Sequence, residues 1–166
     1  MATNIKLIDF QLAQQELARE LKKFQGDKFV TVGIHSDAGQ HPDAGISNAQ
    51  LGALLNYGNE TNTLHGNPAP IPPRPWLVPG VQSATQDIID ASADAIANGL
   101  TPDQTLNQIG AFAAGATQQY MTDLREPPNS PYTIEQKGSS NPLIDTGALR
   151  ASVTWKVTSE KPEEGL

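Results

Sequence analysis

The chain of 166 residues has no cysteine. This absence excludes disulfide bonds, a thiol nucleophile and thiolate metal ligands, so the fold must be held by burial alone. Basic residues are also few, because 11 Lys and Arg stand against 18 Asp and Glu, for a net charge of -7. Affinity for DNA comes mainly from cations that release counterions from phosphates, so this balance argues against a nucleic-acid reader.

Long hydrophobic runs are absent as well. No stretch approaches the roughly 18 to 20 apolar residues of a membrane span, and the start, MATNIKLIDFQ, is polar where a signal peptide would be apolar. We therefore expect a soluble protein, made inside a cell, that does not contact a membrane. At this length we expect one domain, residues 1–158, and a disordered polar tail, residues 159–166.

Three segments have apolar residues at steps of three and four, which predicts amphipathic helices over residues 9–25, 81–98 and 101–124. The third begins with an N-cap, a proline at the first helical position and a capping-box glutamine, at Thr101, Pro102 and Gln104. The first segment carries its apolar stripe at Phe10, Ala13, Leu17, Leu21 and Phe24.

A shorter helix is expected after a turn-rich loop. Ser47 and Gln50 form a capping box ahead of NAQLGALLNY, and Gly58 closes the helix. Residues 125–142 are polar and contain Pro and Ser, so we expect an irregular loop there.

Two segments alternate and are rich in β-branched residues, which predicts strands at residues 28–34 and 151–157. The fold class that follows is α+β. We expect a small, mostly antiparallel sheet, completed by short strands that the sequence does not place, packed against the N-terminal helix and the two central helices.

A proline-rich arm, residues 59–80, holds six prolines between Pro68 and Pro79. Each proline removes a backbone donor, so this arm cannot pair as a central strand. Within it, Arg74-Pro75-Trp76-Leu77 presents one cation and one large apolar surface on a stiff segment. Such a segment either folds back on its own domain or docks on a partner through its Trp and Arg.

The triplet Asp145-Thr146-Gly147 has the form that aspartic proteases place around a catalytic carboxylate. Such an enzyme needs two carboxylates sharing a proton, and a chain with one triplet must dimerise to supply them. Only 19 residues follow Gly147, too few for the remaining strands of that fold, so the protease stays a remote alternative. We expect Asp145 or Thr146 to cap a short helical turn and Leu149 to enter the core.

No other pattern indicates catalysis or a cofactor. The three histidines lie in loops without the spacing of a zinc site, and we expect them to be solvated. We find no phosphate-binding glycine loop, dinucleotide fingerprint or Ser-His-Asp pattern. We therefore expect a protein that is not an enzyme and that binds neither cofactor nor metal.

Three motifs in order resemble the tail-completion or head–tail joining (neck) proteins of long-tailed bacteriophages, including minor tail protein Z-like sequences. They are VTVGI followed by NAQLGALLNYGNE, then IPPRPWL, then NPLIDTGALRASVTW. The resemblance spans roughly residues 28 to 157 and departs at Asn56, where the family more often has an acidic residue. It implies structural or interface roles for Arg74, Pro75, Trp76, Leu77, Asp145, Thr146, Gly147, Leu149 and Arg150.

The resemblance also implies a location and partners. A neck protein forms a homo-oligomeric ring, sixfold or twelvefold, at the head–tail junction of the virion, after assembly in the bacterial cytoplasm. Its neighbours are the head–tail connector or adaptor proteins and the tail-tube or terminator proteins, and DNA passes through its channel without sequence-specific binding. A tail-tube terminator or another tail structural protein is the alternative within this class.

The acidity is concentrated in one place. Residues 81–124 hold five Asp and no Lys or Arg. If these helices line the channel of a ring, their negative field would repel passing DNA and keep it mobile.

Overall fold

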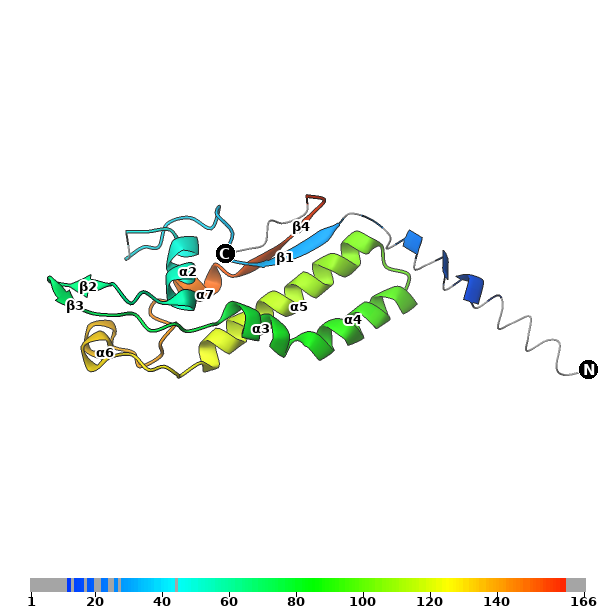
Figure 1. The fold of residues 1–166 in the computed structure, drawn as a ribbon. Helices are drawn as coiled ribbons and strands as arrows, with labels where there is room; N and C mark the ends of the chain where they lie inside the picture. The colour runs from blue at the N-terminus through cyan, green and yellow to red at the C-terminus, as the bar shows by residue number, and fades with distance from the viewer. Residues whose placement is uncertain are drawn as a thin grey trace, which may run out of the picture.

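The computed structural model describes residues 12, 14–16, 18, 19, 22, 23, 26, 28–43 and 45–160. The predicted α+β class is confirmed, because the chain combines helices with a small antiparallel sheet that packs on α5 (Figure 1). The elements in chain order are β1 (Phe29–Gly33), α2 (Asn48–Tyr57), β2 (Thr63–Leu64), β3 (Asn67–Pro68), α3 (Leu77–Ser83), α4 (Thr85–Ala97), α5 (Pro102–Asp123), α6 (Pro131–Lys137), α7 (Ala148–Ala151) and β4 (Thr154–Thr158).

The main sheet joins the two strands that the sequence predicts. β1 and β4 pair antiparallel, with Val30 opposite Val157 and Val32 opposite Trp155. The second strand begins at Thr154, three residues later than predicted, because residues 148–151 form the helical turn α7 instead. The additional strands, β2 and β3, form a separate two-stranded hairpin and do not extend this sheet.

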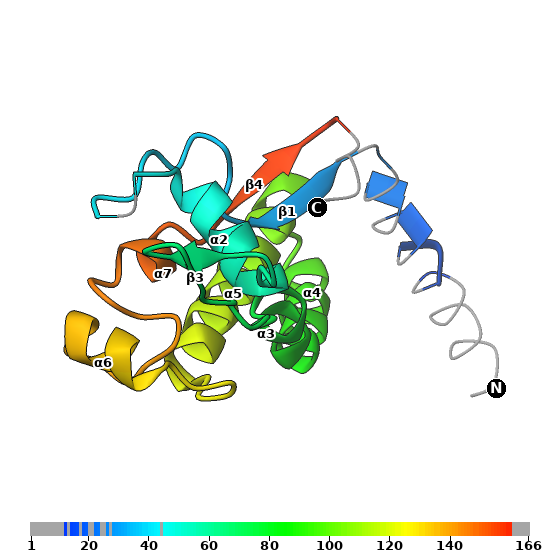
Figure 2. The same cartoon turned by 60° about the vertical axis from the view of Figure 1, so that its left-hand side comes forward.

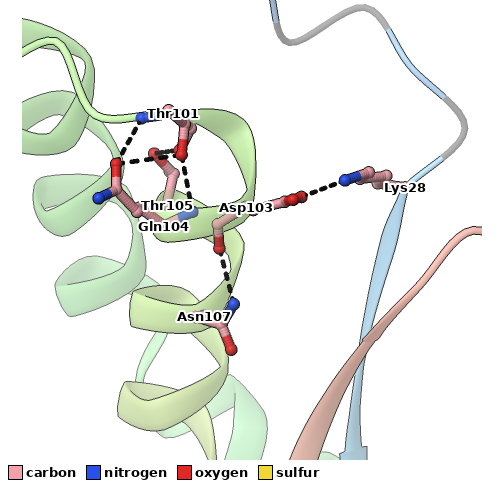
Figure 3. A network of polar contacts seen from close by, with 6 residues as sticks. All are labelled: Lys28, Thr101, Asp103, Gln104, Thr105 and Asn107. Carbon is pink, nitrogen blue, oxygen red and sulfur yellow. Dashed lines mark hydrogen bonds and ion pairs between the residues drawn. The ribbon is translucent and has the colours of Figure 1, made fainter.

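The longest helix, α5, lies along the sheet and carries much of the core (Figures 1 and 2). Its N-terminus has the predicted capping box. The Thr101 hydroxyl accepts from the backbone N–H of Gln104, and the side-chain oxygen of Gln104 accepts from the backbone N–H of Thr101. Figure 3 shows this network, with Asp103 reaching across to the ammonium group of Lys28 at the start of β1. The cap satisfies the first amides of α5, and the exposed ion pair links its first turn to the start of β1.

The predicted helix over residues 81–98 is two helices. α3 starts at Leu77, inside the segment expected to be an irregular arm, because Asn56 Oδ1 accepts from the backbone N–H of Trp76 at 3.1 Å and of Leu77 at 3.4 Å. Pro79 is tolerated there because it falls in the first helical turn. The chain then turns at Ala84, and α4 continues to Ala97.

The predicted irregular loop, residues 125–142, contains α6. The Ser130 hydroxyl accepts from Thr133 N–H at 3.1 Å, Pro131 is the first helical residue, and Gly138 closes the helix with a φ of 66°. These residues are ordinary start and stop signals of a helix, so the sequence did contain the signals that predict α6. The polar composition of the segment had hidden a helix that has no fully buried residue.

The core gathers side chains from distant parts of the chain. Its fully buried members are Trp76, Ala114, Met121, Leu143, Leu149 and Val153. The expectation that all three histidines are solvated is wrong for His41, which is buried and whose Nδ1 accepts from the Asp43 N–H at 3.2 Å. This hydrogen bond offsets the loss of water around the ring.

The described residues between positions 12 and 23 are helical and exposed. All five residues of the predicted N-terminal stripe lie outside the described part of the chain, and so does the tail from residue 161 onward. No helix within the described ranges is long and apolar enough to span a bilayer.

Close packing of α5 against the sheet requires a glycine. A Cβ added at Gly110 would stand 2.3 Å from Cδ1 of Trp155, whereas one added at Gly115, five residues along the same helix, would meet no atom within 4 Å. We predict that Gly110→Ala lowers the free energy of unfolding by about 1–3 kcal/mol through overpacking. Gly115→Ala should raise it by up to about 1 kcal/mol through helix propensity.

Chemical denaturation of the two variants, followed by circular dichroism, measures both effects. Equal behaviour of the two variants would contradict this account of the α5–sheet contact.

Candidate docking groove

A groove of about 810 Å³ lies where the arm, α2, α6 and the segment before α7 meet. Most of its lining is apolar, with leucines from α2 and the core and prolines from the arm and the following turn. The apolar lining residues are Leu51, Leu55, Leu64, Ala69, Pro70, Ile71, Pro72, Pro128, Tyr132, Pro142, Leu143 and Leu149. Its size and apolar character are typical of a binding site rather than of a packing defect.

Arg74 holds one side of this groove in place. Its guanidinium is buried, with 4% of the residue exposed, and donates from Nε to the Pro127 carbonyl at 2.8 Å and from Nη2 to the Pro128 carbonyl at 3.0 Å. Nη2 also contacts Asn129 Oδ1 at 3.4 Å. Burial lowers the pKa of Arg74 below its ordinary value, yet an arginine stays charged, and three oxygen acceptors compensate that charge.

Asn141 connects the segment before α7 to Asn129, which contacts Arg74, and to Lys137 of α6. Its carbonyl accepts from Asn129 Nδ2 at 3.1 Å and from Lys137 Nζ at 3.0 Å. Its side chain donates to the Thr122 carbonyl at 2.9 Å and accepts from two following amides. Sequence analysis did not single out Asn141, although an Asn-Pro pair is a recognised turn signal.

The arm is anchored to α2 as well. Asn59 and Ile71 exchange two backbone hydrogen bonds, and the Arg74 N–H donates to the Leu55 carbonyl at 2.8 Å. Gly58 has a φ of 74°, and a Cβ there would stand 2.5 Å from the Ile71 carbonyl oxygen, so only glycine permits this approach. The sequence left two possibilities for the arm, folding back on its own domain or docking on a partner. The structure shows the first for its central part.

Five of the residues singled out from the sequence line the groove: Arg74, Asp145, Thr146, Gly147 and Leu149. The other four do not. Pro75 is exposed, Leu77 starts α3, and Arg150 is exposed with its Nη1 at 3.3 Å from the Thr122 hydroxyl.

Trp76 is a core residue. It is 3% exposed and its indole N–H donates to the Gly52 carbonyl at 3.0 Å. Of the two alternatives, folding back on its own domain or docking on a partner, the enclosure of this side chain agrees with the first, since partner anchors lie at the surface.

The triplet before α7 has the expected local structure with a different division of roles. Thr146 Oγ1 accepts from the Ala148 N–H at 3.3 Å, and Gly147 is the N-cap with a φ of 86°. Leu149 enters the core with 4% exposed. The Asp145 side chain is exposed at the groove and lies close enough to Lys137 to affect its protonation.

Four charged side chains line the groove: Arg74, Lys137, Asp43 and Asp145. Burial is the main cause that lowers the pKa of Lys137, the charge of Arg74 adds to it, and Asp145 opposes it. Within the described residues neither cation forms an ion pair. Nor does any cluster of three or more His, Asp or Glu in that part of the chain have a geometry suited to a metal ion.

This arrangement is suited to holding an apolar segment. It brings no second carboxylate into hydrogen-bonding contact with Asp145 among the described residues, and its polar groups mainly bond to the surrounding backbone. Comparison with protein-family profiles, curated proteins and solved structures finds no match to this chain.

The guanidinium of Arg74 is a sensitive point of the groove. We predict that Arg74→Lys lowers the free energy of unfolding by about 1–3 kcal/mol. The single ammonium group of lysine lacks the guanidinium fork, so it cannot reach all three oxygens and leaves buried acceptors unpaired. Arg125 also donates to two carbonyls but is exposed, so Arg125→Lys should change stability by less than about 0.5 kcal/mol. Urea unfolding of both variants tests the difference, and equal midpoints would contradict it.

Proposed function

We propose that this chain is a structural protein of a tailed phage virion. It is a ring-forming tail-completion or neck component that joins the capsid connector to the tail tube and leaves a channel for DNA. The observation that supports this most is the groove. Two of the three motifs that resemble the neck family, the arm around Arg74 and the segment from Pro142 to Leu149, lie together there, and the helix of the first motif contributes Leu51 and Leu55. Motifs distant in sequence thus share one surface, as expected for an interface.

Other features of the chain agree with this role. The β1–β4 sheet has only two strands, so each strand has an edge without a partner strand among the described residues, and open edges favour contacts with neighbouring chains. Ring subunits meet through different surfaces that close by rotation. A tail-tube terminator would share these properties and differ in its neighbours.

Imaging of virions in which the chain carries a small fused label tests the location. Density at the head–tail junction is the expected result. Absence of the chain from mature virions would overturn the proposal, and density at the distal end of the tail would favour another tail protein.

Asp145 separates the structural role from the protease alternative. We predict that Asp145→Asn leaves the amount of assembled particles unchanged within about twofold, because Thr146 and Gly147, not Asp145, form the turn before α7. An aspartic protease would lose all turnover with this change. Particle yield and cleavage of the virion proteins, compared between wild type and variant, measure both outcomes, and loss of a cleavage step would reveal an enzyme.

The acidic helix α4 offers a test of the channel. Asp87, Asp90 and Asp94 recur at steps of three and four, so they share one face, and all three are exposed. We propose that this face lines the channel and repels DNA. We predict that replacing all three with Lys slows genome ejection severalfold in particles shown to contain the variant.

A charge-matched control separates this effect from net charge. It carries lysine at three exposed glutamates outside α4, namely Glu60, Glu135 and Glu160. Time courses of DNA release distinguish the two, and unchanged ejection in the α4 variant would contradict a channel role for this face.

A further inference from the structure

The groove and the described N-terminal residues, which lie between positions 12 and 23, stand at opposite ends of the molecule. The groove takes its lining from the β2–β3 hairpin, the arm and α6. Figures 1 and 2 both place the described N-terminal residues, in blue, beyond the start of β1 and away from α6 and the hairpin. The start of β1 is tied to the start of α5 by Lys28 and Asp103, and α5, with 22 residues, spans about 33 Å toward the other end.

The sequence of the N-terminal segment, residues 10–24, predicts an amphipathic helix with one apolar stripe. In sequence, Leu17 and Leu21 occupy the centre of that stripe, and Gln15 and Arg19 lie on the opposite face. The described positions of the segment, Gln15 and Arg19 among them, are helical and exposed. An amphipathic helix at the end of a molecule buries its stripe most readily in an apolar groove of another molecule.

We infer that the N-terminal segment of one copy docks its stripe into the groove of the next copy. The inference rests on the proposed ring and names the contact that builds it. Because the donated helix and the accepting groove lie at opposite ends, the contact is heterologous, and successive copies form a closed ring when the rotation permits. Each copy donates one helix and accepts one.

Charge favours the same pairing. Residues 1–30 hold five Lys and Arg against four Asp and Glu, for a net charge of +1, so the rest of the chain carries -8 to give the total of -7. Of the four charged side chains that line the groove, Asp43 and Asp145 are exposed, whereas Arg74 is buried and Lys137 is half-buried, so the accessible charge there is acidic. The described basic residues Arg19 and Lys22 of the N-terminal segment are exposed. Opposite net charges guide the encounter and discourage contacts between two grooves.

The groove also offers exposed apolar side chains at its opening. Leu64 on β2 is 41% exposed and Tyr132 on α6 is 50% exposed, and both line the groove. Large exposed apolar groups beside an apolar cavity extend the surface that a docked helix would cover. They also permit substitutions that leave the core intact.

Cysteine cross-linking tests the contact directly, since the natural chain has no cysteine. One set of chains carries Leu17→Cys or Leu21→Cys, and a second set carries Leu64→Cys or Tyr132→Cys. Equimolar mixtures of one chain from each set are oxidised at high protein concentration. We expect a mixed disulfide dimer in at least one of the four pairs, because bonding needs Cα atoms within about 7 Å.

Two controls define the specificity. Gln15→Cys places the thiol on the opposite face of the N-terminal segment, and Val78→Cys, at a position 62% exposed, places one outside the groove; neither should cross-link above background. Absence of every stripe–groove disulfide would overturn the inference. So would a dominant Leu21→Cys homodimer, since it would mean that two N-terminal helices cover each other.

Complementation supplies a second test that distinguishes a heterologous contact from any other. The double variant Leu17→Asp, Leu21→Asp keeps its groove and loses its stripe, and Leu64→Asp, Tyr132→Asp keeps its stripe and loses its groove. Circular dichroism establishes that both remain folded. Each alone should sediment as a monomer, and the mixture as a one-to-one dimer; larger rings from either variant alone, or a wild type that stays monomeric at every concentration, would contradict the inference.

The outcomes separate this contact from the proposed function. Stripe–groove cross-links in a protein absent from the head–tail junction would leave the contact standing and overturn the neck role. A protein located at the junction without such cross-links would keep the neck role and overturn the contact.

Discussion

The buried guanidinium of Arg74 is the interaction on which the groove depends. It donates to the Pro127 and Pro128 carbonyls, so it holds the arm against the turn that follows α5. From there Asn129 and Asn141 continue the network to the segment before α7. A lone buried cation is costly, and this one is accommodated because a short turn aims several oxygens at it. The position of that turn therefore decides where the groove opens.

Packing around α5 sets the second constraint. Glycine at position 110 lets Trp155 of β4 lie against the helix, and Gly80 lets α3 approach Thr117 closely. The small residues Gly110 and Thr117 of α5 are thus explained by packing on two faces. Because α5 fixes the sheet on one side and α3 on the other, the arm that leads into α3 is drawn over the core.

The proposed neck role links these constraints to assembly. A preformed apolar groove at one end and an amphipathic segment at the other give a chain two different surfaces, as a ring subunit needs. The acidic face of α4 belongs neither to the groove nor to the N-terminal segment, so it is available to face a channel. Under this proposal, contacts between chains carry the function.

The sequence by itself determined the local structure wherever a signal lies within a few residues. The capping boxes at Ser47 and Thr101, the two paired strands and the turn before α7 follow from short-range hydrogen bonds and periodicity. Only the tertiary structure decided that Trp76 is core, that His41 is buried and that α3 begins at Leu77. The first and the last depend on partners distant in sequence, Gly52 for the indole and Asn56 for the first amides of α3. Periodicity carries no information about such contacts, because burial is set by the whole chain.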